Sequence, residues 1–194
     1  MPPIRQLPPD YREVRSITLT ERGLLLRLNL LALLPMAAAL ALMIGWTAVI
    51  PAGGGAGEGA PWWLNVILTL LIVLPLHELL HGAAIRLTGH RPRYGIKLAQ
   101  GVLYATADGA YFRWREYIFI ALTPLAAITL LGMILMPLVA PSWRMLIVMA
   151  VVLNAGGAVG DLWSVWMLRR FPEDTLIQDR GDSFSIYARS ASGS

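Results

Sequence analysis

Long apolar runs separated by polar segments dominate the chain. The runs cover about residues 24–50, 62–87, 117–139 and 143–168. Each has the roughly 20 residues that a helix needs to cross the hydrocarbon core of a bilayer. We therefore predict an all-α polytopic membrane protein, with four transmembrane helices over residues 23–168 between a polar N-terminal segment (1–22) and a polar C-terminal tail (169–194).

Short segments rich in β-branched and aromatic residues predict strands outside the apolar runs. Three of them lie between the second and third runs and predict a small β-sheet with a hairpin over residues 91–115, in which Asp108-Gly109 is a tight turn. These segments are residues 94–98, 102–106 and 110–113. Weaker strand candidates are residues 12–20 and 184–187. Thr20 is the expected N-cap of the first helix.

Positive charge predicts the orientation of the chain. Lysine and arginine gather before the first run, between the second and third runs, and after the fourth run, whereas the two other loops carry only Glu58 and Arg144. Positive residues tend to remain on the cytoplasmic side of a membrane. Both termini and the predicted sheet are therefore expected to be cytoplasmic.

Composition supports a membrane protein and excludes several kinds of site. Charged residues make up 14% of the chain and hydrophobic residues 56%, whereas soluble domains carry roughly 25% charged residues. The excess of 16 Lys+Arg over 12 Asp+Glu suits anionic lipid as a partner. No nucleic-acid motif accompanies it, so nucleic acid is not an expected partner. The chain has no cysteine, which excludes disulfides and thiolate metal ligands.

A His-Glu-x-x-His motif lies in the second apolar run, at His77, Glu78 and His81. Residues four apart share a helix face, so the two imidazoles can point at one metal ion while Glu78 reaches a water molecule beside it. The alternative is a set of polar residues packed between helices, although intramembrane ionisable groups are expensive and usually functional. One Zn2+ ion is the expected cofactor, with His77 and His81 as ligands and Glu78 as the catalytic base.

Zinc needs a third protein ligand. Among the candidates, His90, Asp108 and Glu116 have ordinary explanations as turn or helix-start residues. Asp161 is the only ionisable residue inside the fourth run, where an unpaired aspartate costs roughly 2.5–3.5 kcal/mol. Counted from the cytoplasmic ends of their helices, His77 and Asp161 lie about 15 and about 12 Å deep. Asp161 is thus the favoured ligand, with a polar partner for a histidine as the alternative.

Small residues precede Asp161 in the stretch Asn154-Ala-Gly-Gly-Ala-Val-Gly-Asp161. They allow a close approach to a neighbouring helix. On a continuous helix Asn154, Gly157 and Asp161 would share one face. Asn154 could hydrogen-bond substrate backbone or a developing oxyanion, and could equally join two helices.

The motif helix, the surface sheet, the segment Thr123-Pro124-Leu125 and the segment from Asn154 to Asp161 together carry a resemblance. The chain resembles a bacterial family of small membrane proteins, the putative zincin peptidases, and is similar to site-2 intramembrane zinc metalloproteases. The resemblance implies proteolysis of a membrane protein or peptide in the bacterial cytoplasmic membrane. Asp161 is followed by Leu162 where site-2 proteases have glycine, and Gly157 stands where they have proline.

Two other functions fit the same residues. A zinc-binding membrane protein without protease activity would carry the same motif. A transporter could use His77, Glu78, His81 and Asp161 as a metal or proton relay, although the four short spans show no internal repeat. No oligomeric state is predicted.

Overall fold

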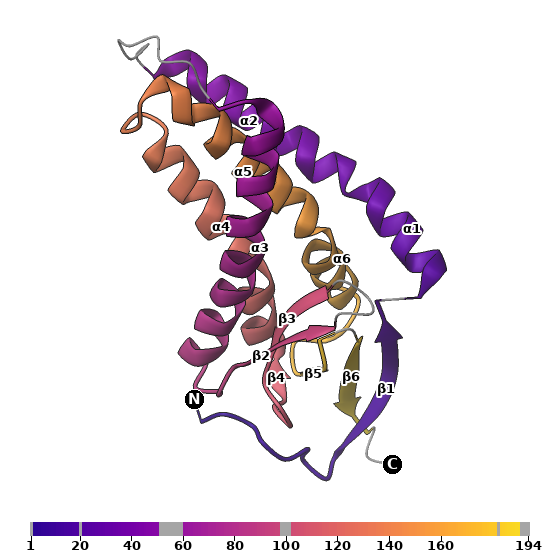
Figure 1. Cartoon of the computed structure of the whole chain (residues 1–194). Coiled ribbons are helices and arrows are strands. Elements are labelled where there is room, and N and C mark those ends of the chain that lie inside the picture. Colours follow the sequence, from indigo (N-terminus) through magenta and orange to yellow (C-terminus); the bar gives the residue numbers. More distant parts are fainter. Residues whose placement is uncertain (1, 20, 51–59, 98–101, 182, 191–194) are drawn as a thin grey trace.

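The computed structural model describes residues 2–19, 21–50, 60–97, 102–181 and 183–190. The helices form an elongated bundle, and the strands lie together at one end of it (Figure 1). The helices are α1 (Arg22–Leu31), α2 (Leu33–Val49), α3 (Trp62–Leu87), α4 (Trp114–Leu135), α5 (Pro141–Gly157) and α6 (Val159–Leu168). The strands are β1 (Tyr11–Thr18), β2 (Arg93–Lys97), β3 (Val102–Thr106), β4 (Phe112–Arg113), β5 (Leu176–Asp179) and β6 (Ser183–Arg189).

Apolar helices long enough to cross a membrane make up most of the chain. Among the described residues, three helical segments meet that requirement, namely Arg22–Val49, Trp62–Leu87 and Trp114–Leu135. The bent pair of α5 and α6 becomes a fourth if it counts as one span. Leu26, Leu34 and Leu71 on these segments are about two-thirds exposed, as expected of side chains that face lipid tails. The chain is therefore mostly helical and has the features of a membrane protein.

The fourth apolar run is not the single helix that its sequence predicts. α5 ends at Gly157, α6 begins at Val159, and the two helices bend by 42°. The bend lies among glycines, which are poor helix formers because they leave the backbone unrestrained. The continuous helix expected to carry Asn154, Gly157 and Asp161 is therefore interrupted, and Asp161 belongs to the first turn of α6. Asn154 and Asp161 nevertheless both contact His77.

The other apolar runs follow their predictions more closely. α3 has the predicted bounds, and α4 begins at Trp114, three residues before the predicted start. The first run is divided into α1 and α2, which meet at Ala32. The predicted N-cap, Thr20, lies outside the described residues, and Glu21 occupies the N-cap position.

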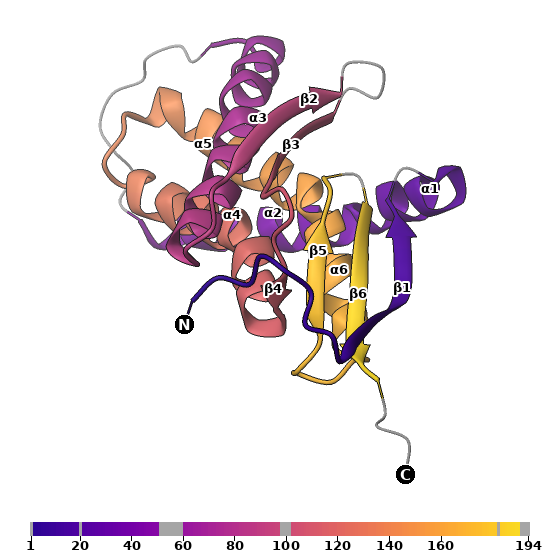
Figure 2. The same ribbon diagram turned by 90° about the horizontal axis from the view of Figure 1, so that it is seen from below.

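The strands form two antiparallel sheets. β2 and β3 pair with each other, whereas the predicted turn at Asp108-Gly109 lies between β3 and β4, which belong to different sheets. The second sheet has the order β1-β6-β5-β4 (Figure 2). The prediction that residues 110–113 continue the hairpin sheet is wrong, because β4 pairs with β5 through Phe112 and Ile177. Phe112 is 1% exposed in the core beneath the helices. Burial of this aromatic side chain gives a physical reason for β4 to join the second sheet.

The two terminal segments pair with each other. β1 lies beside β6, with Tyr11 opposite Arg189 and Thr18 opposite Ser183. The main hydrophobic core lies between this sheet and the ends of the helices. Its members include Ala84, Tyr117, Phe112, Leu168, Ile177, Phe184 and Ile186. The four-stranded sheet thereby closes one end of the helix bundle.

Close contact between α4 and α5 at Gly132 gives a test of the helix packing. A methyl carbon added at Gly132 would lie 2.5 Å from Cγ2 of Val151. Gly132→Ala should therefore destabilise the protein by about 1–3 kcal/mol through overpacking. The matched control is Gly45→Ala in α2, where an added carbon meets no described atom within 4 Å. Thermal unfolding in detergent measures both, and equal melting temperatures would contradict this packing.

Candidate metal centre

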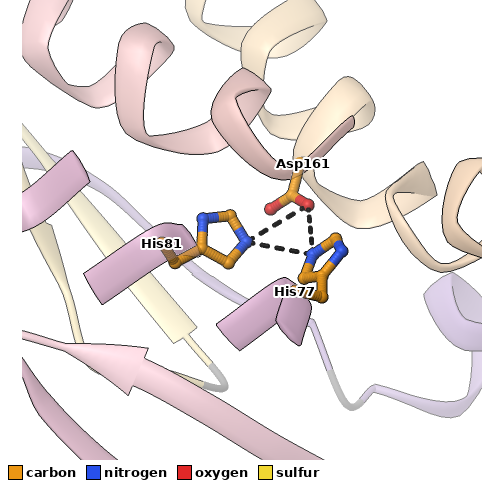
Figure 3. A group of neighbouring side chains, drawn as sticks. All are labelled: His77, His81 and Asp161. Carbon is orange, nitrogen blue, oxygen red and sulfur yellow. Dashed lines mark hydrogen bonds and ion pairs between the residues drawn. The ribbon is translucent and has the colours of Figure 1, made fainter. Parts of the chain in front are cut away.

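α3 presents His77 and His81 on its buried side. Each histidine is 9% exposed, and Nε2 of His81 lies 3.1 Å from Nε2 of His77. The pair follows from helix geometry, because residues four apart stand one above the other on one face. Both rings turn their Nε2 atoms toward α6 (Figure 3).

Asp161 approaches the two histidines from the first turn of α6. Its Oδ2 lies 3.3 Å from Nε2 of His77 and 3.5 Å from Nε2 of His81. The positive end of the α6 dipole favours a carboxylate at this position. The ligand atoms of the three residues all lie within 4.8 Å of one another. The structure therefore brings together the three residues that the sequence proposes as metal ligands.

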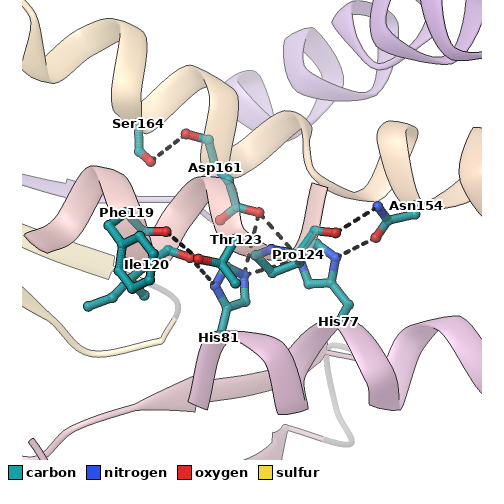
Figure 4. Close-up of polar contacts among 9 residues, drawn as sticks. All are labelled: His77, His81, Phe119, Ile120, Thr123, Pro124, Asn154, Asp161 and Ser164. Atoms are coloured by element: carbon teal, nitrogen blue, oxygen red, sulfur yellow. Dashed lines mark hydrogen bonds and ion pairs between the residues drawn. The ribbon is translucent and has the colours of Figure 1, made fainter. Parts of the chain in front are cut away.

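A proline in α4 leaves a backbone carbonyl free to accept a hydrogen bond from His81. Pro124 has no backbone N–H, so the carbonyl of Ile120, four residues earlier, loses its usual helical donor. Nδ1 of His81 lies 3.0 Å from that carbonyl oxygen (Figure 4). A carbonyl oxygen only accepts hydrogen bonds, so Nδ1 of His81 carries the proton and donates it.

Asn154 in α5 holds the other histidine. Its Nδ2 donates to the carbonyl of Pro124 at 3.2 Å, which leaves its Oδ1 as the acceptor. Oδ1 lies 2.9 Å from Nδ1 of His77, so His77 also donates from Nδ1. Asn154 is 1% exposed. Its two hydrogen bonds connect α5 with α3 and α4. The structure thus shows Asn154 joining helices, which is one of the two roles that its sequence leaves open.

The hydrogen bonds at Nδ1 determine what the Nε2 atoms can do. With Nδ1 donating on each neutral ring, both Nε2 atoms present lone pairs to each other and to the Asp161 carboxylate. Three electron-rich atoms this close in a buried site repel one another unless a metal ion or a shared proton lies between them. The donor set thus has the chemistry of a metal centre, and outer hydrogen bonds of this kind are typical of histidine ligands.

The spacing of the three atoms also suits zinc. Two ligands about 2.05 Å from a tetrahedral zinc ion lie about 3.3 Å apart. The three separations here are 3.1, 3.3 and 3.5 Å. Two imidazoles and one carboxylate are a ligand set that catalytic zinc sites use, with a fourth position left for water. The residues present therefore fit a zinc ion.

The remaining candidates from the sequence lie elsewhere and have structural partners. Nδ1 of His90 lies 3.2 Å from Oγ1 of Thr88, and burial lowers the pKa of His90. Asp108 forms an ion pair with Arg93. Glu116 belongs to a capping box with Arg113 at the start of α4. In the structure these three carboxyl and imidazole groups do not join the cluster of His77, His81 and Asp161.

A cavity of about 160 Å³ adjoins the metal-ligating atoms. Glu78 lines it together with both histidines and Asp161, so one space is open to the acid–base group and to the metal position. β3 forms another wall through Leu103, Tyr104 and Ala105. Phe184 of β6 contributes a wall from the four-stranded sheet. The cavity thus lies between the helix bundle and both sheets.

Sequence reasoning missed the acceptor of His81. The Ile120 carbonyl is a backbone group, so no residue type marks it. Its signal is Pro124, because a proline inside a long apolar helix frees the carbonyl four residues earlier.

Comparisons with known proteins concern the part of the chain that contains this site. The model of a family described as "Putative zincin peptidase" matches residues 70–176. That range includes the three motif residues and the proposed third ligand, namely His77, Glu78, His81 and Asp161. No curated protein and no solved structure matches the chain. Because the family match covers more than half of the sequence, the chain belongs to the Putative zincin peptidase family.

Proposed function

We propose that the protein is an intramembrane zinc metalloprotease that hydrolyses peptide bonds of membrane-embedded substrates. Its family indicates a metallopeptidase. The observation that carries the proposal is the convergence of His77, His81 and Asp161 beside Glu78 on helices apolar enough to span a membrane. A catalytic zinc site uses three protein ligands and keeps a fourth position for water, whereas a structural site is closed by four protein ligands.

His77, His81 and Asp161 would hold the ion through Nε2, Nε2 and a carboxylate oxygen. When bound, zinc supplies Lewis acidity, which activates water and polarises a peptide carbonyl. Glu78 accepts the proton of the attacking water and then delivers it to the leaving amine, as a general base and then a general acid. Its position in the same cavity as the ligands allows both transfers.

The substrate is a membrane peptide that unwinds next to β3. A transmembrane helix keeps its carbonyls in hydrogen bonds, so hydrolysis needs a locally extended segment. β3 is an edge strand of the two-stranded sheet, and Leu103, Tyr104 and Ala105 on it line the cavity of Glu78. Strand addition at such an edge holds an extended peptide through its backbone. The likeness to site-2 proteases stands on the ligand set and this strand, with Leu162 and Gly157 as the departures.

The strand-bearing end of the molecule is proposed to face the cytoplasm of a bacterial cell. Arg86 lies in the last turn of α3, Arg113 precedes α4, and Arg169 follows α6, so positive residues lie at the end of the bundle that carries both sheets. Positive residues tend to be retained on the cytoplasmic side. Both termini would then be cytoplasmic, with membrane lipid and the peptide substrate as partners and no nucleic acid.

Glu78→Gln tests the acid–base assignment. We expect cleavage of a membrane substrate in liposomes to fall by roughly 10²–10⁴, because proton transfer contributes about that factor. Zinc content, measured by elemental analysis, should stay at the wild-type value. The control is Glu173→Gln, which removes an exposed ion pair with Arg115 and should leave cleavage unchanged. Equal cleavage by Glu78→Gln and wild type would contradict the mechanism, and zinc binding without any wild-type cleavage would favour a non-proteolytic protein.

Asn154→Ala tests the role of the buried amide. Removing the acceptor of His77 should weaken zinc binding by about 10–100-fold, as loss of an outer hydrogen bond does at histidine sites. A competition titration with a chelator measures this change. Asn65→Ala is the matched control, because Asn65 is also buried but bonds to the Ala60 carbonyl at the start of α3. Unchanged zinc affinity with reduced cleavage would instead assign Asn154 to the substrate.

Pro124→Ala should have opposite effects on stability and on zinc affinity. Alanine is by far the better residue in a helix interior, so the melting temperature should rise. The restored N–H would compete with His81 for the Ile120 carbonyl, and zinc affinity should fall by up to about tenfold. A raised melting temperature with unchanged zinc affinity would show that the freed carbonyl does not position His81.

A further inference from the structure

A second cavity adjoins the catalytic residues. Its volume is about 230 Å³, several times the roughly 30 Å³ of a water molecule in the liquid. Three residues of the proposed site line it, namely His77, Glu78 and Asn154. Its other walls are Val73, Leu74, Leu103, Leu153 and Gly157, all of which are apolar. The two cavities share four lining residues and differ in chemistry; the shared residues are His77, Glu78, Leu103 and Gly157.

The polar and apolar cavities follow one another along β3. Leu103 lines both cavities, whereas Ala105 lines only the one that contains His81 and Asp161. Residues two apart on a strand point to the same face about 7 Å from each other. An extended peptide beside β3 would thus pass Glu78 with one side chain next to the apolar walls and the side chain two residues along next to the polar ones.

Gly157 decides how much room the apolar cavity has. It is the last residue of α5 and lines both cavities. A carbon added there meets no described atom within 4 Å, and the backbone is helical, so a Cβ fits at this position without strain. Packing therefore does not require glycine at this position. A side chain at position 157 would occupy space that a ligand could otherwise use.

We propose that the apolar cavity lined by Val73, Leu74, Leu103, Leu153 and Gly157 is a specificity pocket that receives a large apolar side chain next to the scissile bond. The inference rests on the proposed protease function and names its substrate class, which is peptides with an aliphatic or aromatic residue at one flanking position. Continuity with Glu78 selects a substrate side chain as the occupant, because the pocket wall includes the catalytic carboxylate. An apolar pocket of this kind discriminates by about 10–200-fold for each methylene that it buries or lacks.

The test compares Gly157→Leu with Gly160→Leu. An added carbon at Gly160 also meets no described atom within 4 Å, but Gly160 lines only the polar cavity. Mass spectrometry first locates the bond that the wild type cuts in a membrane-spanning model peptide. Peptides with Leu or Ala at each flanking position are then cleaved in liposomes. We expect the wild type to prefer Leu over Ala at one flanking position by at least about tenfold.

Filling the pocket should remove that preference. Gly157→Leu should lower cleavage of the Leu peptide by roughly tenfold or more relative to the Ala peptide. Gly160→Leu should change both peptides of that series by the same factor. A preference for Leu that survives Gly157→Leu would overturn the pocket assignment. Absence of cleavage by the wild type would contradict the protease proposal itself, and the subsite with it.

A binding measurement separates the pocket from turnover. The Glu78→Gln variant is incubated with the same peptide carrying benzoylphenylalanine at the preferred flanking position, and the products of illumination are mapped by mass spectrometry. Crosslinks to Val73, Leu74 or Leu153 are expected, and Gly157→Leu in the same background should reduce them. Crosslinks confined to residues of the polar cavity, such as Phe184 or Tyr117, would overturn the assignment.

Discussion

The mutual repulsion of three lone-pair donors is the constraint that the structure has to meet. Nε2 of His77, Nε2 of His81 and Oδ2 of Asp161 lie 3.1–3.5 Å apart. In a weakly polar interior such a group is stable only with a metal ion or a shared proton between its members. The protein therefore needs elements that hold the three atoms together before any ion binds. Hydrogen bonds at Nδ1 hold each imidazole ring in place. The N-terminal end of α6 holds the Asp161 carboxylate.

Two irregular helices provide these supports. In α4, Pro124 releases the Ile120 carbonyl for His81 and offers its own carbonyl to Asn154. Between α5 and α6, the glycine-rich bend separates Asn154, which meets His77, from Asp161, which meets both histidines. Free backbone groups are expensive in a membrane, so irregular helices survive there only where other groups satisfy them. In this protein, His81 satisfies the Ile120 carbonyl and Asn154 satisfies the Pro124 carbonyl.

The sheets complete the site from one end of the bundle. β3 lies beside Glu78, and the four-stranded sheet contributes Phe184 to the polar cavity. Its pairing of β1 with β6 joins the two ends of the chain. The Ile177, Ile186 and Phe112 side chains bury the junction between this sheet and the helices. The site thus depends on strands from three distant parts of the sequence.

The sequence by itself determined the local features of the protein. Apolar runs predicted the spans, the spacing of His77 and His81 predicted a common face, and the isolated Asp161 predicted a partner at the same depth. These features depend on periodicity and on the expense of intramembrane charge, which are readable from nearby residues. Only the tertiary structure decided the bend at Ala158, the use of the Ile120 carbonyl and the pairing of β4 with β5. Those outcomes depend on which distant surfaces pack together, because a backbone carbonyl carries no sequence signal and a strand's partner is chosen by the burial of its side chains.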